Sequence, residues 1–178
     1  MSFIKRFALI CAVSMALSGC GGGSSDPATD SYVFPAGKAT LAFSAISTAA
    51  LPASISGVDF DITLPQGMTV TTEGGVSGQI ETASVQPGAA LNGTNLAFGS
   101  YSASTGKARL SMATTSGSYR AGELLRLACT VAPTANVTLG DLKALNNPVT
   151  VVKAVGYDPV TQDTVALTGK VKILLSVP

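Results

Sequence analysis

The sequence has no histidine and no tryptophan among its 178 residues, and only 12% of its side chains are charged. Histidine is the commonest general base and the commonest zinc ligand. Its absence therefore excludes a serine–histidine–aspartate triad and removes the usual zinc ligand. The 11 basic residues nearly balance the 10 acidic ones. Because no basic stripe is left to contact phosphates, we expect no nucleic acid partner.

Cysteine is also scarce, and Cys11, Cys20 and Cys129 suggest no convincing disulfide. Cys129 falls in an alternating apolar stretch with no base beside it, so we predict a small buried hydrophobe rather than a nucleophile. The sequence contains no G-x-S-x-G elbow and no phosphate-binding loop, and "STGKAR" from Ser104 indicates a hairpin turn. A serine–lysine dyad stays open. We nevertheless predict no catalytic residue, no metal or other cofactor, and no enzyme.

What the sequence does contain begins with a leader. Lys5 and Arg6 precede an apolar run over residues 7–17, and small residues follow it. This pattern is typical of a secretory signal peptide, which we place at residues 1–19. As a helix the apolar run would cover only about 16 Å, roughly half of a bilayer core, so it is too short for a stable membrane span.

The end of this leader, Leu17-Ser18-Gly19-Cys20, resembles the lipobox of bacterial lipoproteins. The resemblance implies that the leader is cut before Cys20 and that Cys20 carries a diacylglycerol thioether, which anchors the protein in a membrane. Residues 20–31, rich in glycine and serine, would form a flexible tether. Gly21 is not the aspartate that favours inner-membrane retention, so we expect the outer membrane. The alternative is an ordinary leader with a chance cysteine near the cut.

Beyond the tether, apolar and polar residues alternate with the period of a β-strand. The clearest strands are expected at residues 58–64, 125–131 and 164–177, each with every second side chain facing the core. Weaker strands are expected at residues 38–46, 78–85, 94–102, 107–115 and 149–158. Turn signals separate them, and only "GDLKALNN" from Gly140 suggests a single helical turn. The pattern predicts an all-β fold, a two-sheet antiparallel β-sandwich over residues 32–178.

The order of these strands resembles the cohesin-like β-sandwich, a jelly-roll family related to some carbohydrate-binding modules. Gly122–Val131 matches its "G-x-L/I-x-x-I-x-F-x-V" strand, and Gly169–Ile173 matches its closing "G-x-V-x-I". The resemblance implies a module that binds either a dockerin-like exported protein or a polysaccharide. Such modules commonly bind polysaccharide through a flat row of aromatics. Because this chain has four tyrosines and no tryptophan, a protein partner is favoured.

Two pairs of acidic residues are the remaining candidates for a site. Asp59 and Asp61 lie on one face of a strand, about 7 Å apart, where they could bind calcium or act as an acid pair, or simply be solvated. Asp158 and Asp163 bracket a hairpin loop, where aspartate often caps a turn and could also hold calcium. We favour the solvated and capping interpretations.

Taken together, the sequence predicts a lipid-anchored, exported, non-catalytic binding module with its lipid at Cys20. The alternative is a structural accessory lipoprotein of an envelope or secretion assembly. A binding module should display clustered tyrosine, arginine or aspartate on one sheet.

Overall fold

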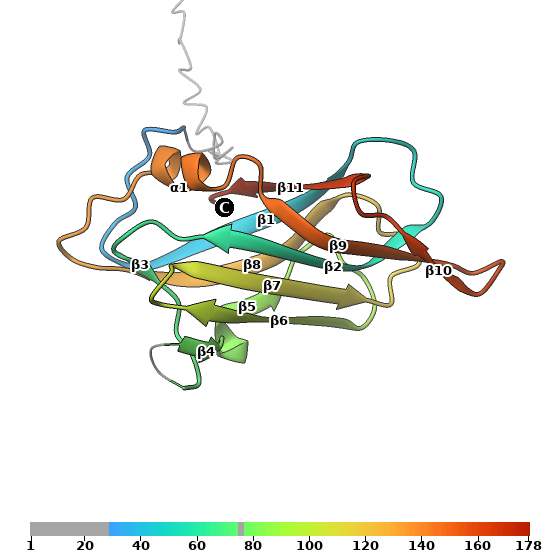
Figure 1. The fold of residues 1–178 in the computed structure, drawn as a ribbon, viewed down its shortest axis with the longest axis horizontal. Helices are drawn as coiled ribbons and strands as arrows, with labels where there is room; N and C mark the ends of the chain where they lie inside the picture. Colours follow the sequence, from blue (N-terminus) through green and yellow to red (C-terminus); the bar gives the residue numbers. More distant parts are fainter. Residues whose placement is uncertain (1–28, 75–76) are drawn as a thin grey trace, which may run out of the picture.

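The computed structural model describes residues 29–74 and 77–178. Nearly all of the regular structure there is β (Figure 1). The strands are β1 (Gly37–Ser47), β2 (Ser54–Thr63), β3 (Met68–Thr69), β4 (Ser77–Gln79), β5 (Val85–Pro87), β6 (Asn95–Ser102), β7 (Lys107–Thr114), β8 (Gly122–Val131), β9 (Thr150–Asp158), β10 (Asp163–Ala166) and β11 (Val171–Ser176). A 3-10 turn, η1 (Thr82–Ser84), and a helix, α1 (Leu139–Leu145), complete the elements.

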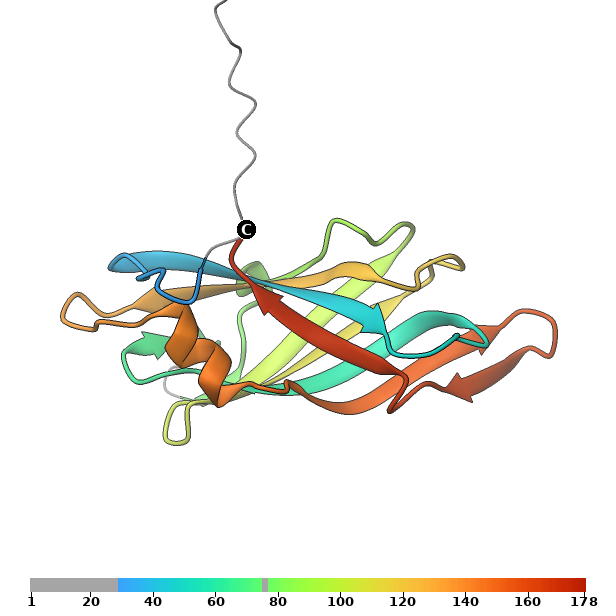
Figure 2. The same cartoon turned by 90° about the horizontal axis from the view of Figure 1, so that it is seen from above.

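These strands form two antiparallel sheets that pack face to face (Figure 2). The six-stranded sheet has the order β10-β9-β2-β7-β6-β4. The five-stranded sheet has the order β11-β1-β8-β3, and β5 also pairs with β8. The prediction of an all-β, two-sheet antiparallel sandwich is therefore confirmed.

The core lies between the two sheets because alternate residues of the central strands are apolar. On β2, Val58, Phe60 and Ile62 are buried, as predicted from the alternation. Phe60 packs against Phe43 of β1 with ring centroids 5.1 Å apart, which joins the two sheets at the centre of the core. Burial of such aliphatic and aromatic side chains is the main stabilising contribution to a sandwich of this kind.

The predicted long strand at residues 164–177 is wrong as one strand. The chain turns between β10 and β11, and the two strands belong to different sheets. Gly169 has φ +85°, and the amide of Lys170 donates to the carbonyl of Leu167 at 2.9 Å, which closes the turn. The alternation runs through this turn because Leu167 and Val171 both point into the same core.

The predicted strand at residues 78–85 is also wrong as one strand. It contains β4, an isolated bridge at Ile80, the turn η1 and the start of β5. The chain crosses here from the six-stranded to the five-stranded sheet. Ile80 and Val85 are both buried, so the apolar pattern continues although the direction of the chain changes.

The helix α1 is longer than the single turn predicted near Gly140. Thr138 caps its first turn: the Thr138 hydroxyl accepts from the amide of Asp141 at 3.0 Å, and the Asp141 carboxylate accepts from the amide of Thr138 at 3.0 Å. This reciprocal arrangement satisfies two backbone donors that a helix start leaves open. Leu139 and Leu142 are buried, and α1 lies at the side of the sandwich, between the two layers (Figure 2).

No helix in residues 29–74 and 77–178 is long and apolar enough to cross a membrane. The predicted signal peptide, the Leu17–Cys20 lipobox and most of the tether lie outside the described residues.

Candidate binding surface

The outer surface of the six-stranded sheet carries most of the residues with potential for recognition. Register places their side chains in rows across β9, β2, β7 and β6. One row contains Lys153, Asp59, Ser111 and Phe98, and the next contains Asp61, Arg109 and Ser100. We call the outward side chains in and next to these two rows the six-stranded face; it comprises Asp59, Asp61, Leu96, Phe98, Ser100, Arg109, Ser111, Ala113, Lys153 and Val155.

Two large apolar side chains are exposed on this face. Leu96 is 59% exposed and Phe98 is 46% exposed, both on β6. Their neighbours Ala97 and Gly99 point inward because side chains alternate along the strand, and at Gly99 the interior has no room for a larger group. A Cβ on Gly99 would lie 2.7 Å from the carbonyl oxygen of Arg109. The steric limit at Gly99 therefore keeps a larger side chain out of this inward position, next to the outward-facing Phe98.

Shallow hollows flank Phe98 on this surface. One, of about 190 Å³, extends toward Asp59 and Lys153. The other, of about 460 Å³, extends toward Arg109 and the strand β4. Phe98 and Ser111 line both, so the phenyl ring stands as a ridge between two polar-edged depressions.

The charges on this face differ in how they are engaged. Arg109 donates from Nε to Asp61 Oδ1 at 2.7 Å and from Nη2 to Asp61 Oδ2 at 2.8 Å. The hydrogen bond from Arg109 holds the pKa of Asp61 below its ordinary value, against the opposing effect of partial burial. In the described part of the chain, neither Asp59 nor Lys153 forms an ion pair. These two side chains are therefore available to a ligand.

The predicted calcium or acid-pair alternative for Asp59 and Asp61 finds no support in this geometry. Asp61 is engaged by Arg109 in a two-point contact. Within residues 29–74 and 77–178, no three metal-ligating side chains cluster. The outward orientation of both carboxylates agrees with the alternation that predicted it.

The second acidic pair lies at the end of the hairpin that joins β9 and β10. Asp158 and Asp163 face each other in the register of these two strands. The Asp158 carboxylate accepts from the amide of Val160 at 2.9 Å, so it caps the turn. This is the capping role that the sequence favoured for Asp158.

Cys129 lies inside the core, 2% exposed and without a disulfide. Burial raises the pKa of its thiol to about 12, so the thiolate that nucleophilic chemistry requires is not formed at neutral pH. Two of the four tyrosines, Tyr101 and Tyr119, are also core residues. Tyr32 and Tyr157 are the exposed ones, on different elements, and they form no row.

The sequence did not identify Phe98, Arg109 or Lys153 as site residues. Phe98 lies in the predicted strand at residues 94–102, where the larger apolar residues would ordinarily be assigned to the core. A usable signal was the Ala97–Gly99 spacing, because small residues at alternate positions indicate a face that packs closely against another layer. The pairing of Arg109 with Asp61 depends on a register between strands 48 residues apart, which no local pattern reveals.

The fold and this surface define a class of protein: a two-sheet antiparallel β-sandwich with an exposed apolar ridge flanked by unpaired charges. Comparison with protein-family models, with curated proteins and with solved structures finds no match to this chain.

Proposed function

We propose that the protein is a lipid-anchored, exported, non-catalytic binding module of the cohesin-like kind, and that its six-stranded face engages the ligand. The observation that carries the proposal is the exposure of Leu96 and Phe98 beside the unpaired Asp59 and Lys153. Exposed aromatic and aliphatic groups gathered on one face mark interaction sites, and neighbouring charges give orientation and selectivity. The expected clustering of arginine and aspartate on one sheet is represented by Arg109, Asp59 and Asp61, whereas Leu96 and Phe98 were not expected there.

Binding accounts for this face better than catalysis does. Its hollows are shallow, and the carboxylate engaged there, Asp61, has a lowered pKa. A general acid at neutral pH requires a raised pKa and a site that restricts water. The six-stranded face offers neither property at Asp61.

The favoured partner is another exported protein rather than a polysaccharide. A polysaccharide platform commonly uses a row of aromatic rings, whereas the exposed aromatic side chains described on this sheet, Phe98 on β6 and Tyr157 near the end of β9, lie on strands that β7 and β2 separate. A mixed surface of one aromatic residue, one aliphatic residue and both signs of charge suits a protein interface. The anchor in this proposal is the lipid at Cys20, with the outer membrane as the destination.

The test is a pull-down of tagged, detergent-solubilised protein from its own envelope, with and without a calcium chelator, read by mass spectrometry. Phe98→Ser should remove the captured partner and weaken its affinity by about 30-fold or more, as for an aromatic residue at the centre of an interface. Leu145→Ser, at an equally apolar and similarly exposed residue at the end of α1, is the matched control and should leave capture unchanged.

The outcomes separate the proposal from its alternative. A partner captured by the wild type and the control variant but lost from Phe98→Ser supports binding through the six-stranded face. A stoichiometric membrane complex that is indifferent to Phe98→Ser would instead favour a structural accessory lipoprotein. If no protein is captured, binding to a glycan array by the wild type and not by Phe98→Ser would identify a polysaccharide ligand.

A further inference from the structure

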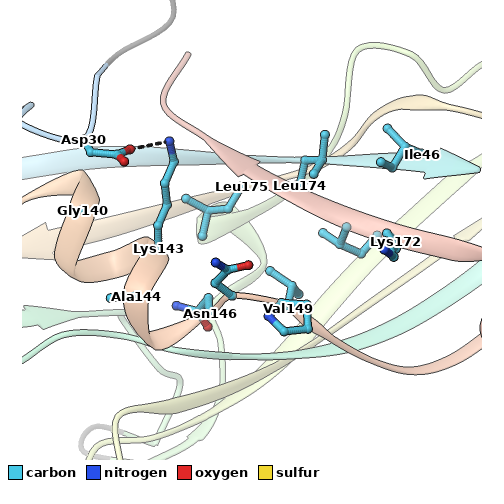
Figure 3. Close-up of a pocket in the computed structure, with 13 residues that line it drawn as sticks. Asp30, Ile46, Gly140, Lys143, Ala144, Asn146, Val149, Lys172, Leu174 and Leu175 are labelled. Atoms are coloured by element: carbon cyan, nitrogen blue, oxygen red, sulfur yellow. Dashed lines mark hydrogen bonds and ion pairs between the residues drawn. The ribbon is translucent and has the colours of Figure 1, made fainter. Parts of the chain in front are cut away.

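A second surface lies on the side of the sandwich, between β11 and the segment that joins α1 to β9. It is a groove of about 630 Å³, within the usual size range of ligand sites. In Figure 3, Leu174, Leu175 and Lys172 come from β11 on one side, and Asn146 and Val149 come from the α1–β9 segment on the other. The groove is thus walled by a strand edge and by a connecting segment.

The backbone of β11 is unpaired along this groove. β11 is the last strand of the five-stranded sheet, and no backbone hydrogen bond in the described residues reaches its outer edge. Just before β11, the amide of Thr48 donates to the carbonyl of Lys170 at 2.9 Å, so Lys170 bonds toward β1. The pairing of β1 with β11 continues from there without a shift in register. In an antiparallel pair, residues alternate between bonding inward and bonding outward. The N–H and C=O groups of Val171, Ile173 and Leu175 therefore point away from β1.

Among the sheet edges described, this one has the greatest length of unpaired strand. β11 has six residues, whereas β10 has four and β4 has three. The opposite edge of the five-stranded sheet is shared by the short strands β3 and β5. An unpaired edge of this length is a template for an added strand, because its donors and acceptors repeat at the strand spacing.

Side chains around this edge specify the chemistry of the occupant. Leu174 is 51% exposed, and Val149, Ile173 and Leu175 add apolar lining. Lys172 is exposed and forms no ion pair in the described residues, whereas Lys143 donates to Asp30 at 2.7 Å. The free charge in the groove is therefore positive.

This charge argues against a second copy of the same strand as the occupant. β11 carries a lysine and no acidic residue, and a further lysine, Lys170, precedes it. Two such edges paired side by side would offer no acidic side chain to any of their lysines, and lysine on an edge strand commonly prevents this pairing. A partner segment with an acidic side chain beside Lys172 gains an attraction instead.

We propose that the edge of β11 receives an extended segment of a partner polypeptide as an added β-strand. The segment would bond its backbone to Val171, Ile173 and Leu175, place apolar side chains in the groove and set an acidic side chain beside Lys172. This site is separate from the six-stranded face and does not depend on the function proposed for that face.

The test uses a displayed library of random heptapeptides selected on the detergent-solubilised full-length protein. The selected peptides should alternate apolar residues and carry a glutamate or aspartate. A synthetic peptide of the consensus should slow amide exchange at Val171, Ile173 and Leu175. N-methylation of its alternate amides should abolish binding, because it removes the backbone donors that an added strand uses.

Charge variants complete the design. Lys172→Glu should weaken binding on the order of tenfold, and exchanging the acid of the peptide for lysine should restore it. Lys38→Glu makes the same charge change on the same sheet, on β1 and outside the groove, and should leave binding unchanged. Phe98→Ser should also leave binding unchanged, so the failure of either proposal is distinguishable from the failure of the other.

The proposal is overturned if no peptide is enriched. It is equally overturned if the consensus peptide tolerates N-methylation, if it binds Lys172→Glu as well as the wild type, or if the protected amides lie on another element.

Discussion

Asn146 forms a buried link between the end of α1 and the end of β2, and its removal gives a prediction with a definite size. Its side-chain oxygen accepts from the amide of Thr63 at 2.7 Å. Its side-chain nitrogen donates to the carbonyls of Thr63 at 2.8 Å and Leu142 at 2.7 Å. At about 1 kcal/mol for each hydrogen bond, Asn146→Ala should lower the free energy of unfolding by about 3 kcal/mol. The melting temperature should fall by about 6–12 °C for a domain of this size.

The isosteric change Asn146→Asp tests the direction of these hydrogen bonds. The introduced carboxylate can still accept from the amide of Thr63, but it faces the carbonyls of Thr63 and Leu142 without donors. Its folded-state pKa should therefore rise above the unfolded value of about 3.9. The variant should match the wild type most closely below about pH 4, and its deficit in stability should grow as the pH rises toward the raised pKa.

Urea unfolding followed by far-UV circular dichroism at pH 4 and pH 7 measures both effects. Asn136→Ala is the matched control, because Asn136 is exposed and its change should stay within about 0.5 kcal/mol. A loss below about 1 kcal/mol for Asn146→Ala would refute the reasoning. So would an Asn146→Asp variant whose deficit is larger at pH 4 than at pH 7.

Three further predictions follow from single contacts. Gly88→Ala should lower the free energy of unfolding in urea by about 1–3 kcal/mol, because the added Cβ would lie 2.3 Å from the carbonyl oxygen of Glu123 in β8. Gly117→Ala is the control: a Cβ there has open space, so this change should be neutral or slightly stabilising. Equal effects of the two changes would contradict the reasoning. Arg109→Ala should raise the pKa of Asp61 in a carboxyl NMR titration, since the hydrogen bond from Arg109 is the largest of the effects that lower it. In the wild type the pairing should be lost as the pH falls through that depressed pKa. Cys129 should resist alkylation in the folded protein and react in urea, as read by mass spectrometry of its peptide; labelling without denaturant would argue against its burial.

Much of the sandwich was predictable because its central strands are half-buried. Phe60 and Leu127 lie at alternating apolar positions, and every second side chain of their strands points into the core. The errors came where the chain changes sheet, at Gly169 and Ile80. An apolar residue is buried there whichever sheet it belongs to, so the pattern records burial and not the path of the chain.

The candidate surface was less predictable, for a physical reason. The outward direction of Asp59 follows from local alternation, but its neighbours across the sheet follow from register with β7 and β9. The close packing at the inward-facing Gly99 involves Arg109 and Leu110 of β7 and the distant Ile80, so the local pattern hints at it without showing it. The free edge of β11 was beyond prediction because the sequence did not reveal the turn at Gly169 that separates β11 from β10.

The way in which the chain enters the sandwich has a mechanical consequence. Before β1 begins, the chain is held by hydrogen bonds that Phe34 makes with Val137, that Leu139 makes with Tyr32 and that Gly140 makes with Asp30. A pulling force applied at the N-terminal side reaches these contacts before it reaches any strand of the two sheets. Once released, residues 30–36 would span at most about 25 Å when fully extended. This entry segment can therefore yield under tension and lengthen the connection while the sheets, and both surfaces they carry, stay folded.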